Sequence, residues 1–222
     1  GIRSRFWPMS TPEYPKQYVD VLGRGMTMIQ MTVERFAPLC PIENMWVVTS
    51  ADYEALVREQ LPHLPVENIL LEPAMRNTAP CIAYACWKIR QKDPSANVVV
   101  TPADALVVDV DDFRKVISRA LEFTAADERI VTIGICPTRP ETGYGYIAAG
   151  AEASAGEVKV LKVDSFREKP AIEVAREYLA AGNYLWNAGI FVWNVDTIVE
   201  SIRAFVPDLA AKMDTMSESF YT

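Results

Sequence analysis

Short apolar runs alternate with amphipathic stretches along the first half of the chain, a pattern typical of layered α/β proteins. Runs rich in β-branched residues predict strands over residues 44–49, 68–72 and 97–101. Strands that are apolar at nearly every position suit a parallel sheet covered on both faces. The pattern therefore predicts helices packed on both sides of a mostly parallel sheet.

Helix starts follow the first two of these strands. Ser50 is placed to cap a helix after the first strand, and Asn77 or Thr78 to cap one after the second. A further helix fits residues 112–123.

The second half of the chain alternates more loosely. Residues 143–149 and 158–167 are separated by a small polar turn, which predicts antiparallel strands at one side of the sheet. The other predicted elements are strands over 129–135 and 188–195, a helix over 173–181, and a last helix capped by Asp196 and ending near Phe205. The chain has no internal repeat, low-complexity tract or evident linker, so we expect one domain over residues 1–222.

Composition and charge exclude some classes of function. The chain has 222 residues, of which 50% are hydrophobic, enough for one large core. Asp and Glu number 29 against 22 Lys and Arg, giving a net charge of −7. A chain of this charge has no overall basic field for nucleic acid, so any anionic ligand must be bound by local groups.

No apolar run approaches the roughly 18–20 residues that cross a bilayer, and no leader-like segment opens the chain. The four cysteines form no CxxC pair and His63 is the single histidine, which argues against a zinc site. We therefore expect a soluble, cytoplasmic protein with reduced thiols and no membrane partner.

Several polar clusters fall where strands end, the usual place for ligands in open α/β sheets. The first is a loop of glycine and cations, Gly1-Ile2-Arg3-Ser4-Arg5, followed by Lys16. Its backbone N–H groups and cations suit a polyphosphate. An ordinary solvated loop is the alternative.

The second cluster, residues 72–80, contains Glu72, Arg76, Asn77 and Thr78 between a strand end and a helix start. Unpaired N–H groups at a helix start favour an anion or the hydrogen-bonding edge of a base. Alternatively, Asn77 and Thr78 only cap the helix.

In the third cluster, Asp104 emerges from an apolar strand. Mg²⁺ takes one or two carboxylates and completes its shell with water and substrate phosphates, so Asp104 is a candidate magnesium ligand. A capped turn is the alternative.

The second half adds a Gly-Tyr-Gly-Tyr segment at 143–146, the Glu168-Lys169 pair, and Asn187. Glycines allow a sugar to approach closely, Glu and Asn suit sugar hydroxyls, and Lys suits a sugar phosphate. A plain β-turn and a solvated strand end would explain the same residues.

Together and in this order, the clusters resemble the sugar-nucleotide pyrophosphorylases, and among them the mannose-1-phosphate guanylyltransferases. The resemblance covers nearly the whole chain. It is carried by the segments GIRSRFWPMS, PKQ, EPAMRNTAP, TPAD, ETGYGYI, FREKP and WNAGIF. It implies a Rossmann-like nucleotidyltransferase fold with a mixed sheet.

The activity implied by the resemblance is transfer of GMP from GTP to mannose 1-phosphate, which gives GDP-mannose and pyrophosphate with Mg²⁺. Arg5 and Lys16 would grip the triphosphate beside Gly1 and Ser4, and Asp104 would hold the metal. The resemblance places the base and ribose at Glu72, Arg76, Asn77 and Thr78. It places the sugar phosphate at Gly145, Glu168, Lys169 and Asn187.

The chain departs from the family pattern at a few positions. Arg3 replaces a glycine of the phosphate loop, Ala103 and Ala105 replace serine and histidine beside Asp104, and Met26 stands where arginine is common. The family's first strand would precede Gly1, and a second metal-binding acid would follow Thr222, so we expect the catalytic domain to be incomplete at both ends.

The departures leave two alternatives open. One is a catalytically silent relative that binds sugar nucleotides and regulates a partner. The other is an enzyme for a different nucleotide or hexose 1-phosphate. The sequence also leaves homo-oligomerisation open.

Overall fold

The computed structural model describes residues 9–72 and 78–221, which belong to two compact units. Unit 1 comprises Gly1–Ala96, Pro102–Arg114 and Val195–Thr222. Unit 2 comprises Asn97–Thr101 and Lys115–Asn194.

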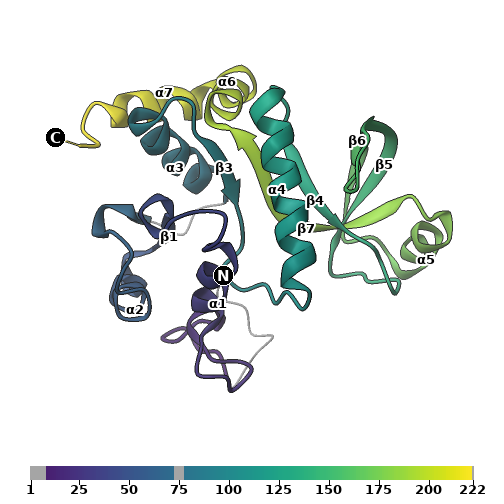
Figure 1. Cartoon of the computed structure of the whole chain (residues 1–222), viewed down its shortest axis with the longest axis horizontal. Helices are drawn as coiled ribbons and strands as arrows, with labels where there is room; N and C mark the ends of the chain where they lie inside the picture. Colours follow the sequence, from purple (N-terminus) through teal and green to yellow (C-terminus); the bar gives the residue numbers. More distant parts are fainter. Residues whose placement is uncertain (1–8, 73–77, 222) are drawn as a thin grey trace. The chain divides into compact units, whose positions relative to one another are not determined.

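Unit 1 combines a pair of parallel strands with helices (Figure 1). The strands β1 (Val47–Ser50) and β2 (Ile69–Glu72) pair with Val47 opposite Ile69. The α-helices are α1 (Met28–Phe36), α2 (Glu54–Gln60), α3 (Thr78–Lys92), α6 (Val195–Phe205) and α7 (Pro207–Ser217). Short 3₁₀ turns are η2 (Lys16–Tyr18), η3 (Ile42–Asn44), η4 (Ala51–Tyr53) and η5 (Val66–Asn68).

Unit 2 is built on one antiparallel sheet with the strand order β3-β7-β5-β6. Its strands are β3 (Asn97–Val100), β4 (Val131–Ile135), β5 (Gly145–Ser154), β6 (Val160–Glu168) and β7 (Tyr184–Asn194). The long strand β7 pairs with β3, β4 and β5, and therefore holds the sheet together. The helices are α5 (Ile172–Ala181) and α4 (Val110–Ala126), which begins in unit 1.

The predicted α/β class is confirmed, but a mostly parallel sheet is not. Among the described residues, β1–β2 is the single parallel pair, and the pairings of β3, β4, β5 and β6 are antiparallel. An apolar run indicates that both faces of a strand are buried. It does not indicate whether the neighbouring strand runs parallel or antiparallel to it. The apolar run at β3 pairs antiparallel with β7, with Val98 opposite Trp193.

Helix boundaries agree with the sequence at some positions and differ at others. Ser50 is a cap as predicted, because its hydroxyl accepts from the Asp52 N–H at the turn that leads into α2. The predicted cap Asp196 is wrong, since Asp196 lies inside the first turn of α6 and its carboxylate contacts Arg90 Nε at 2.5 Å. The sequence patterns also missed α1 and α7.

One apolar cluster lies beside the parallel strands of unit 1, and we call it the strand-end core. Tyr18, Val57 and Ile69 are among its buried members, and Leu71 and Ala103 pack against it. A second cluster joins α3, α6 and α7, which lie side by side in Figure 1. Within the described residues, no helix is both long and apolar enough to cross a membrane.

A thiol ties the first turns of α3 to the end of β2. Cys81 Sγ donates to Glu72 Oε1 at 2.5 Å. Burial, together with this carboxylate, raises the pKa of the Cys81 thiol to about 12. The thiol therefore stays protonated near neutral pH and remains a hydrogen-bond donor to Glu72.

We predict that Cys81 resists alkylation in the folded protein. At pH 8 a thiol with a pKa of about 12 is ionised in only about one molecule in 10,000, and the thiolate is the reactive form. Cys136 is exposed and should be modified first. The measurement is iodoacetamide labelling followed by peptide mass spectrometry, with protein unfolded in guanidinium as the control in which both cysteines react. Equal labelling of Cys81 and Cys136 in folded protein would contradict the Cys81–Glu72 contact.

Candidate active site

Lys16 and Asp104, which are 88 residues apart in the chain, meet in unit 1. Lys16 Nζ donates to the backbone carbonyl of Asp104 at 2.9 Å and lies 3.8 Å from the carboxylate oxygen Oδ2. The side chains are 26% and 43% exposed, so both can reach a ligand from solvent. This arrangement brings a cation and an acid together at one point, as binding of a metal–phosphate group requires.

The strand-end core explains why these residues meet. Tyr18, two residues after Lys16, is buried in this core, and its hydroxyl hydrogen-bonds Thr49 of β1 at 2.9 Å. Ala103, next to Asp104, packs against the same core. The packing of apolar neighbours therefore fixes the backbone from which the polar side chains project.

Glu72 is placed by the same core, because its neighbour Leu71 packs against it. Glu72 is the last residue of β2, and α3 begins at Thr78, as the sequence predicts. The acid thus lies at the carboxyl end of the parallel pair, opposite Ser50. The other predicted nucleotide and phosphate residues, Gly1, Ser4, Arg5, Arg76 and Asn77, lie outside the described residues.

The donor set suits one mode of metal binding. In the described part of the chain, no three His, Cys, Asp or Glu side chains gather to form a metal cage. A single exposed carboxylate such as Asp104 fits Mg²⁺ when substrate phosphates and water complete the octahedron. The site is therefore suited to a metal that arrives with its phosphate ligands.

In unit 2, strand register brings Gly145, Glu168 and Asn187 together. Gly145 lies opposite Glu168 across the β5–β6 pair, and Tyr146 lies opposite Trp186 across the β5–β7 pair. A Cβ atom at Gly145 would come within 2.8 Å of Glu168 Oε2 and 3.5 Å of the Asn187 Cβ. A larger residue at this position would therefore displace the Glu168 carboxylate, so glycine allows the carboxylate to lie directly over the strand.

Hydrogen bonds orient the Asn187 amide. Its Oδ1 accepts the Gly189 N–H at 2.9 Å and lies 3.5 Å from Thr132 Oγ1. Since the oxygen is engaged with the protein, the amide nitrogen is the donor end that remains for a ligand. With Glu168 as the acceptor, this patch offers the two groups that recognise sugar hydroxyls.

Lys169 holds a backbone conformation that side chains rarely adopt. Its φ is 43°, the one positive value for a residue other than glycine in the described part of the chain. Its N–H donates to the Tyr144 carbonyl at 3.2 Å, and its Nζ lies 3.1 Å from Glu168 Oε1. Such strain costs about 1–2 kcal/mol and is typical of functional positions. Lys169 therefore joins the group formed by Gly145, Glu168 and Asn187.

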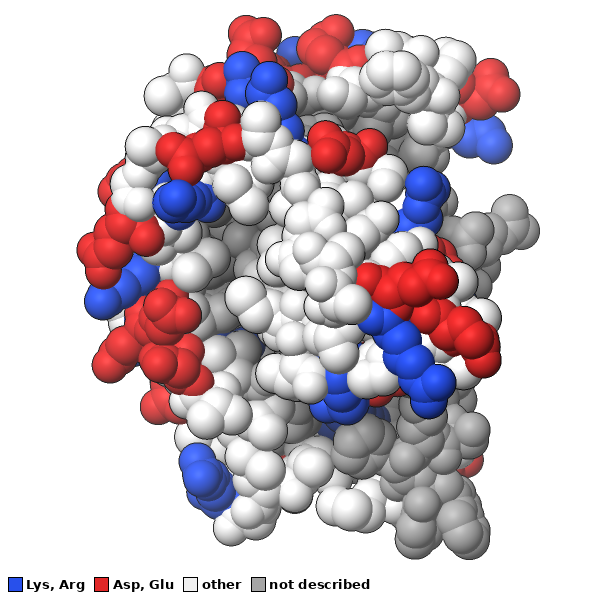
Figure 2. Space-filling view, turned by 90° about the vertical axis from the view of Figure 1, so that its right-hand side faces the viewer, with Lys and Arg blue, Asp and Glu red and all other residues white. Residues whose placement is uncertain are grey.

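Charged side chains do not gather into one field on the face drawn in Figure 2. Lys and Arg are interspersed there with Asp and Glu, in keeping with the net charge of −7. Anions on this face must therefore be bound by individual cations, as the sequence indicates.

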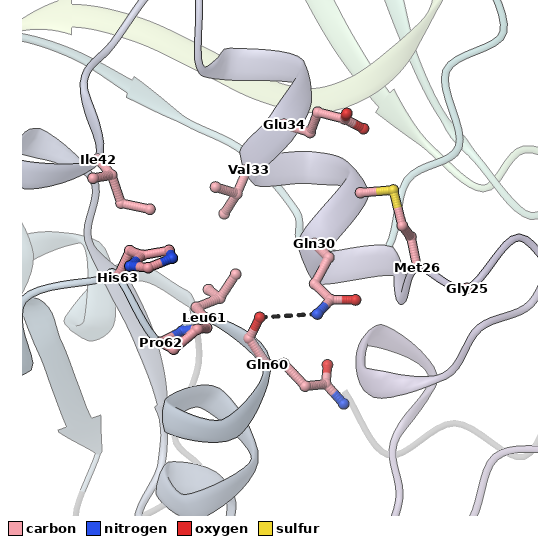
Figure 3. Close-up of a pocket in the computed structure, with 10 residues that line it drawn as sticks. All are labelled: Gly25, Met26, Gln30, Val33, Glu34, Ile42, Gln60, Leu61, Pro62 and His63. Atoms are coloured by element: carbon pink, nitrogen blue, oxygen red, sulfur yellow. Dashed lines mark hydrogen bonds between the residues drawn. The ribbon is translucent and has the colours of Figure 1, made fainter.

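A hollow of about 270 Å³ lies elsewhere in unit 1, between α1 and the segment that ends α2 (Figure 3). Val33, Leu61 and His63 are among its lining residues, and none of the predicted site residues is. Two of its lining residues bind each other, since Gln30 Nε2 donates to the Gln60 carbonyl at 2.9 Å. Because none of the residues that the sequence assigns to the substrates lines this hollow, we do not assign the active site to it.

Two side chains that contact the site were not singled out from the sequence. Cys81 donates to Glu72, and Arg35 of α1 binds the carbonyl of Ala105, next to Asp104. A thiol and an arginine in helical stretches carry no motif. The one available signal for Arg35 was its place on the core-facing side of an amphipathic helix, with the buried residues Met28, Thr32 and Phe36.

Comparison with known proteins finds relatives that match nearly the whole chain. The chain is 40% identical to a mannose-1-phosphate guanylyltransferase of Escherichia coli over 94% of its own length and 44% of the relative's. It is 38% identical to the alginate biosynthesis protein AlgA of Pseudomonas aeruginosa, covering 94% of this chain and 43% of AlgA. The chain thus spans less than half the length of these relatives.

A solved structure extends the comparison to the fold. It is a Thermus thermophilus protein titled mannose-1-phosphate geranyltransferase, with a TM-score of 0.85 and 32% identity over 96% of this chain and 60% of that one. The family model described as nucleotidyl transferase matches residues 1–217. The chain therefore belongs to the nucleotidyl transferase family.

Proposed function

We propose that the protein transfers GMP from GTP to mannose 1-phosphate, giving GDP-mannose and pyrophosphate, with Mg²⁺ as the metal. The observation that carries the proposal is the contact of Lys16 with Asp104, with Nζ 2.9 Å from the Asp104 carbonyl. These two residues come from distant segments that the resemblance assigns to one task. The names of the relatives from Escherichia coli and other bacteria support the same substrates.

In this reaction the main tasks of the protein are to position the two substrates and to neutralise their charge. An oxygen of the sugar phosphate attacks the α-phosphorus of GTP in line, and pyrophosphate leaves from the opposite side. Two polyanions must therefore be held close together against their repulsion. Mg²⁺ bound at Asp104 with the phosphates would neutralise charge on their oxygens.

The residues of unit 1 would serve the nucleotide. The Lys16 ammonium would donate to phosphate oxygens, and the core-packed Ala103 would hold Asp104 in place. Glu72, oriented by the Cys81 thiol, would accept hydrogen bonds from the guanine edge. By resemblance, Arg5 with Gly1 and Ser4 would bind the triphosphate, and Arg76, Asn77 and Thr78 would face the base and ribose.

The residues of unit 2 would serve the sugar phosphate. Gly145, which has no side chain, would let the Glu168 carboxylate and Asn187 lie close together beside the sugar. Glu168 would accept from sugar hydroxyls, and the Asn187 amide nitrogen would donate to them. Lys169, adjacent to Glu168, would bind the phosphate.

The departures at Ala103 and Ala105 do not weaken the proposal. Ala103 packs its methyl group against the strand-end core, and Ala105 is engaged through its backbone carbonyl. The contacts that hold the Asp104 backbone therefore require no polar side chain at either position. A single catalytic domain over residues 1–222 and a cytoplasmic location remain predictions.

The direct test is pyrophosphate release by the purified full chain. We expect release that depends on GTP, mannose 1-phosphate and a divalent metal together. Parallel assays with ATP, CTP and UTP, and with glucose 1-phosphate, test the proposed specificity. Normal GTP binding without release would favour a regulatory relative, and preference for another substrate pair would replace the proposed one.

We predict that Asp104→Ala lowers turnover by about 100-fold or more, because it removes charge stabilisation at the transferring phosphate. GTP binding measured without metal should change little. Asp109→Ala is the matched control, since Asp109 lies in the same loop and its carboxylate accepts the Asp112 N–H at the start of α4. Steady-state kinetics and isothermal calorimetry give the two quantities. Equal losses of turnover and metal-free GTP binding would show that Asp104 only supports the turn.

We predict that Lys169→Ala raises the KM for mannose 1-phosphate by about tenfold, because a hydrogen bond to a charged group is worth about 1.5–3 kcal/mol. The KM for GTP should stay within about twofold. Lys162→Ala removes an exposed lysine of β6, the strand that ends just before Lys169, and should leave both constants unchanged. Kinetics at varied sugar phosphate measure the effect. A KM for mannose 1-phosphate equal to that of Lys162→Ala rules out the assignment.

A further inference from the structure

Arg35 carries a charge into the interior of unit 1. The residue is 4% exposed, although arginine is almost always solvated in proteins. Its guanidinium lies 5.3 Å from the centre of the Phe113 ring, and its Nη2 donates to the Ala105 carbonyl at 2.9 Å. Burial lowers the pKa of the Arg35 guanidinium, which reflects the cost of keeping the charge there.

This burial is poorly compensated. Among the described residues, no carboxylate forms an ion pair with Arg35, and its buried Nη1 has no hydrogen-bond partner. The hydrogen bond to one carbonyl and the contact with one ring face stabilise the guanidinium less than the hydration that it loses on burial. An apolar side chain of similar volume would pack at this position at lower cost. Stability alone therefore does not account for the arginine.

The location of the contact suggests its role. Ala105 directly follows Asp104, whose own carbonyl accepts from Lys16 Nζ at 2.9 Å. Two consecutive carbonyls are thus each bound by a cation, one from η2 and one from α1. With Ala103 packed against the strand-end core, each of residues 103–105 is held by its own contact.

We infer that Arg35 is a positioning residue that fixes the backbone at Asp104, so that the carboxylate is presented to the metal and phosphates. The inference rests on the proposed function. Arg35 acts through the loop and does not touch the substrate, because its side chain is buried beneath Ala105 and Phe113. Fixing the loop in advance removes the entropy cost of ordering it when the metal–nucleotide complex binds.

The test measures metal binding directly as well as turnover. Mn²⁺ replaces Mg²⁺ as an observable probe, and its affinity for the full chain saturated with GTP is followed by electron paramagnetic resonance. Arg35→Met should weaken Mn²⁺ binding by about tenfold, the lower end of what supporting partners of metal ligands contribute. Metal-free GTP affinity should stay within about twofold, and kcat should fall more than KM for GTP rises.

The matched control is Arg114→Met. Arg114 Nε donates to the Arg35 carbonyl at 2.9 Å and its Nη2 to the Glu34 carbonyl at 3.3 Å, but neither bond reaches residues 103–105. This variant should lower the unfolding temperature while Mn²⁺ affinity stays at the wild-type value. A purely structural role for Arg35 predicts that both variants behave alike.

Three outcomes overturn the inference: unchanged Mn²⁺ affinity in Arg35→Met, equal losses in Arg35→Met and Arg114→Met, or a wild-type chain that binds no Mn²⁺ with GTP. If Arg35→Met does not fold, Arg35→Gln decides by the same measurements, because it also removes the charge and the reach to Ala105. A wild-type chain that binds Mn²⁺ and GTP but releases no pyrophosphate refutes the proposed function alone, since the binding comparison does not depend on turnover.

Discussion

The candidate nucleotide site depends on the packing of a single apolar cluster. The strand-end core buries Tyr18 and holds Leu71 and Ala103 against its surface. Each of these residues lies one or two positions from a polar residue of the site, namely Lys16, Glu72 and Asp104. Close-packed side chains allow little movement, so the core sets the positions of three segments that are far apart in the chain. The polar side chains next to the core therefore project from backbone segments whose positions are already fixed.

In unit 2, strand register sets the relative positions of the candidate sugar-phosphate residues. Gly145, Glu168 and Asn187 lie on three neighbouring strands, and hydrogen-bonded pairing fixes which residues face one another. Shifting a strand by one residue would turn its side chains to the opposite face, so the ladder is as strict a constraint as core packing. The strained backbone at Lys169, with a φ of 43°, is held by its bond to the Tyr144 carbonyl.

Local sequence patterns predicted most elements and the antiparallel pair formed by β5 and β6, but not the pairing of strands that are distant in the chain. The strand positions and the Ser50 cap follow from apolar runs and turn chemistry. The antiparallel pairing of β3 with β7 joins residues almost 100 positions apart, so no local sequence pattern indicates it. Helix α1 was missed because Thr32 and Arg35 stand on its buried face and interrupt the apolar period, although Thr27 and Gln30 form a capping box. Recognisable motifs supplied the site candidates, whereas the contact of Cys81 with Glu72 carries no motif, because it arises only from tertiary structure.

Lys16 and Asp104 are in contact without a direct hydrogen bond between their charged groups. Lys16 Nζ makes its 2.9 Å bond to the Asp104 carbonyl and stands 3.8 Å from the nearer carboxylate oxygen, beyond hydrogen-bond length. A direct charge-assisted bond would have to be broken before a divalent cation could take the carboxylate. The lysine therefore hydrogen-bonds the backbone of the loop and keeps only a longer ion-pair contact with the carboxylate. For the proposed reaction, a chain with a net charge of −7 would bind polyanions through individual cations such as Lys16, which the Asp104 carbonyl holds in place.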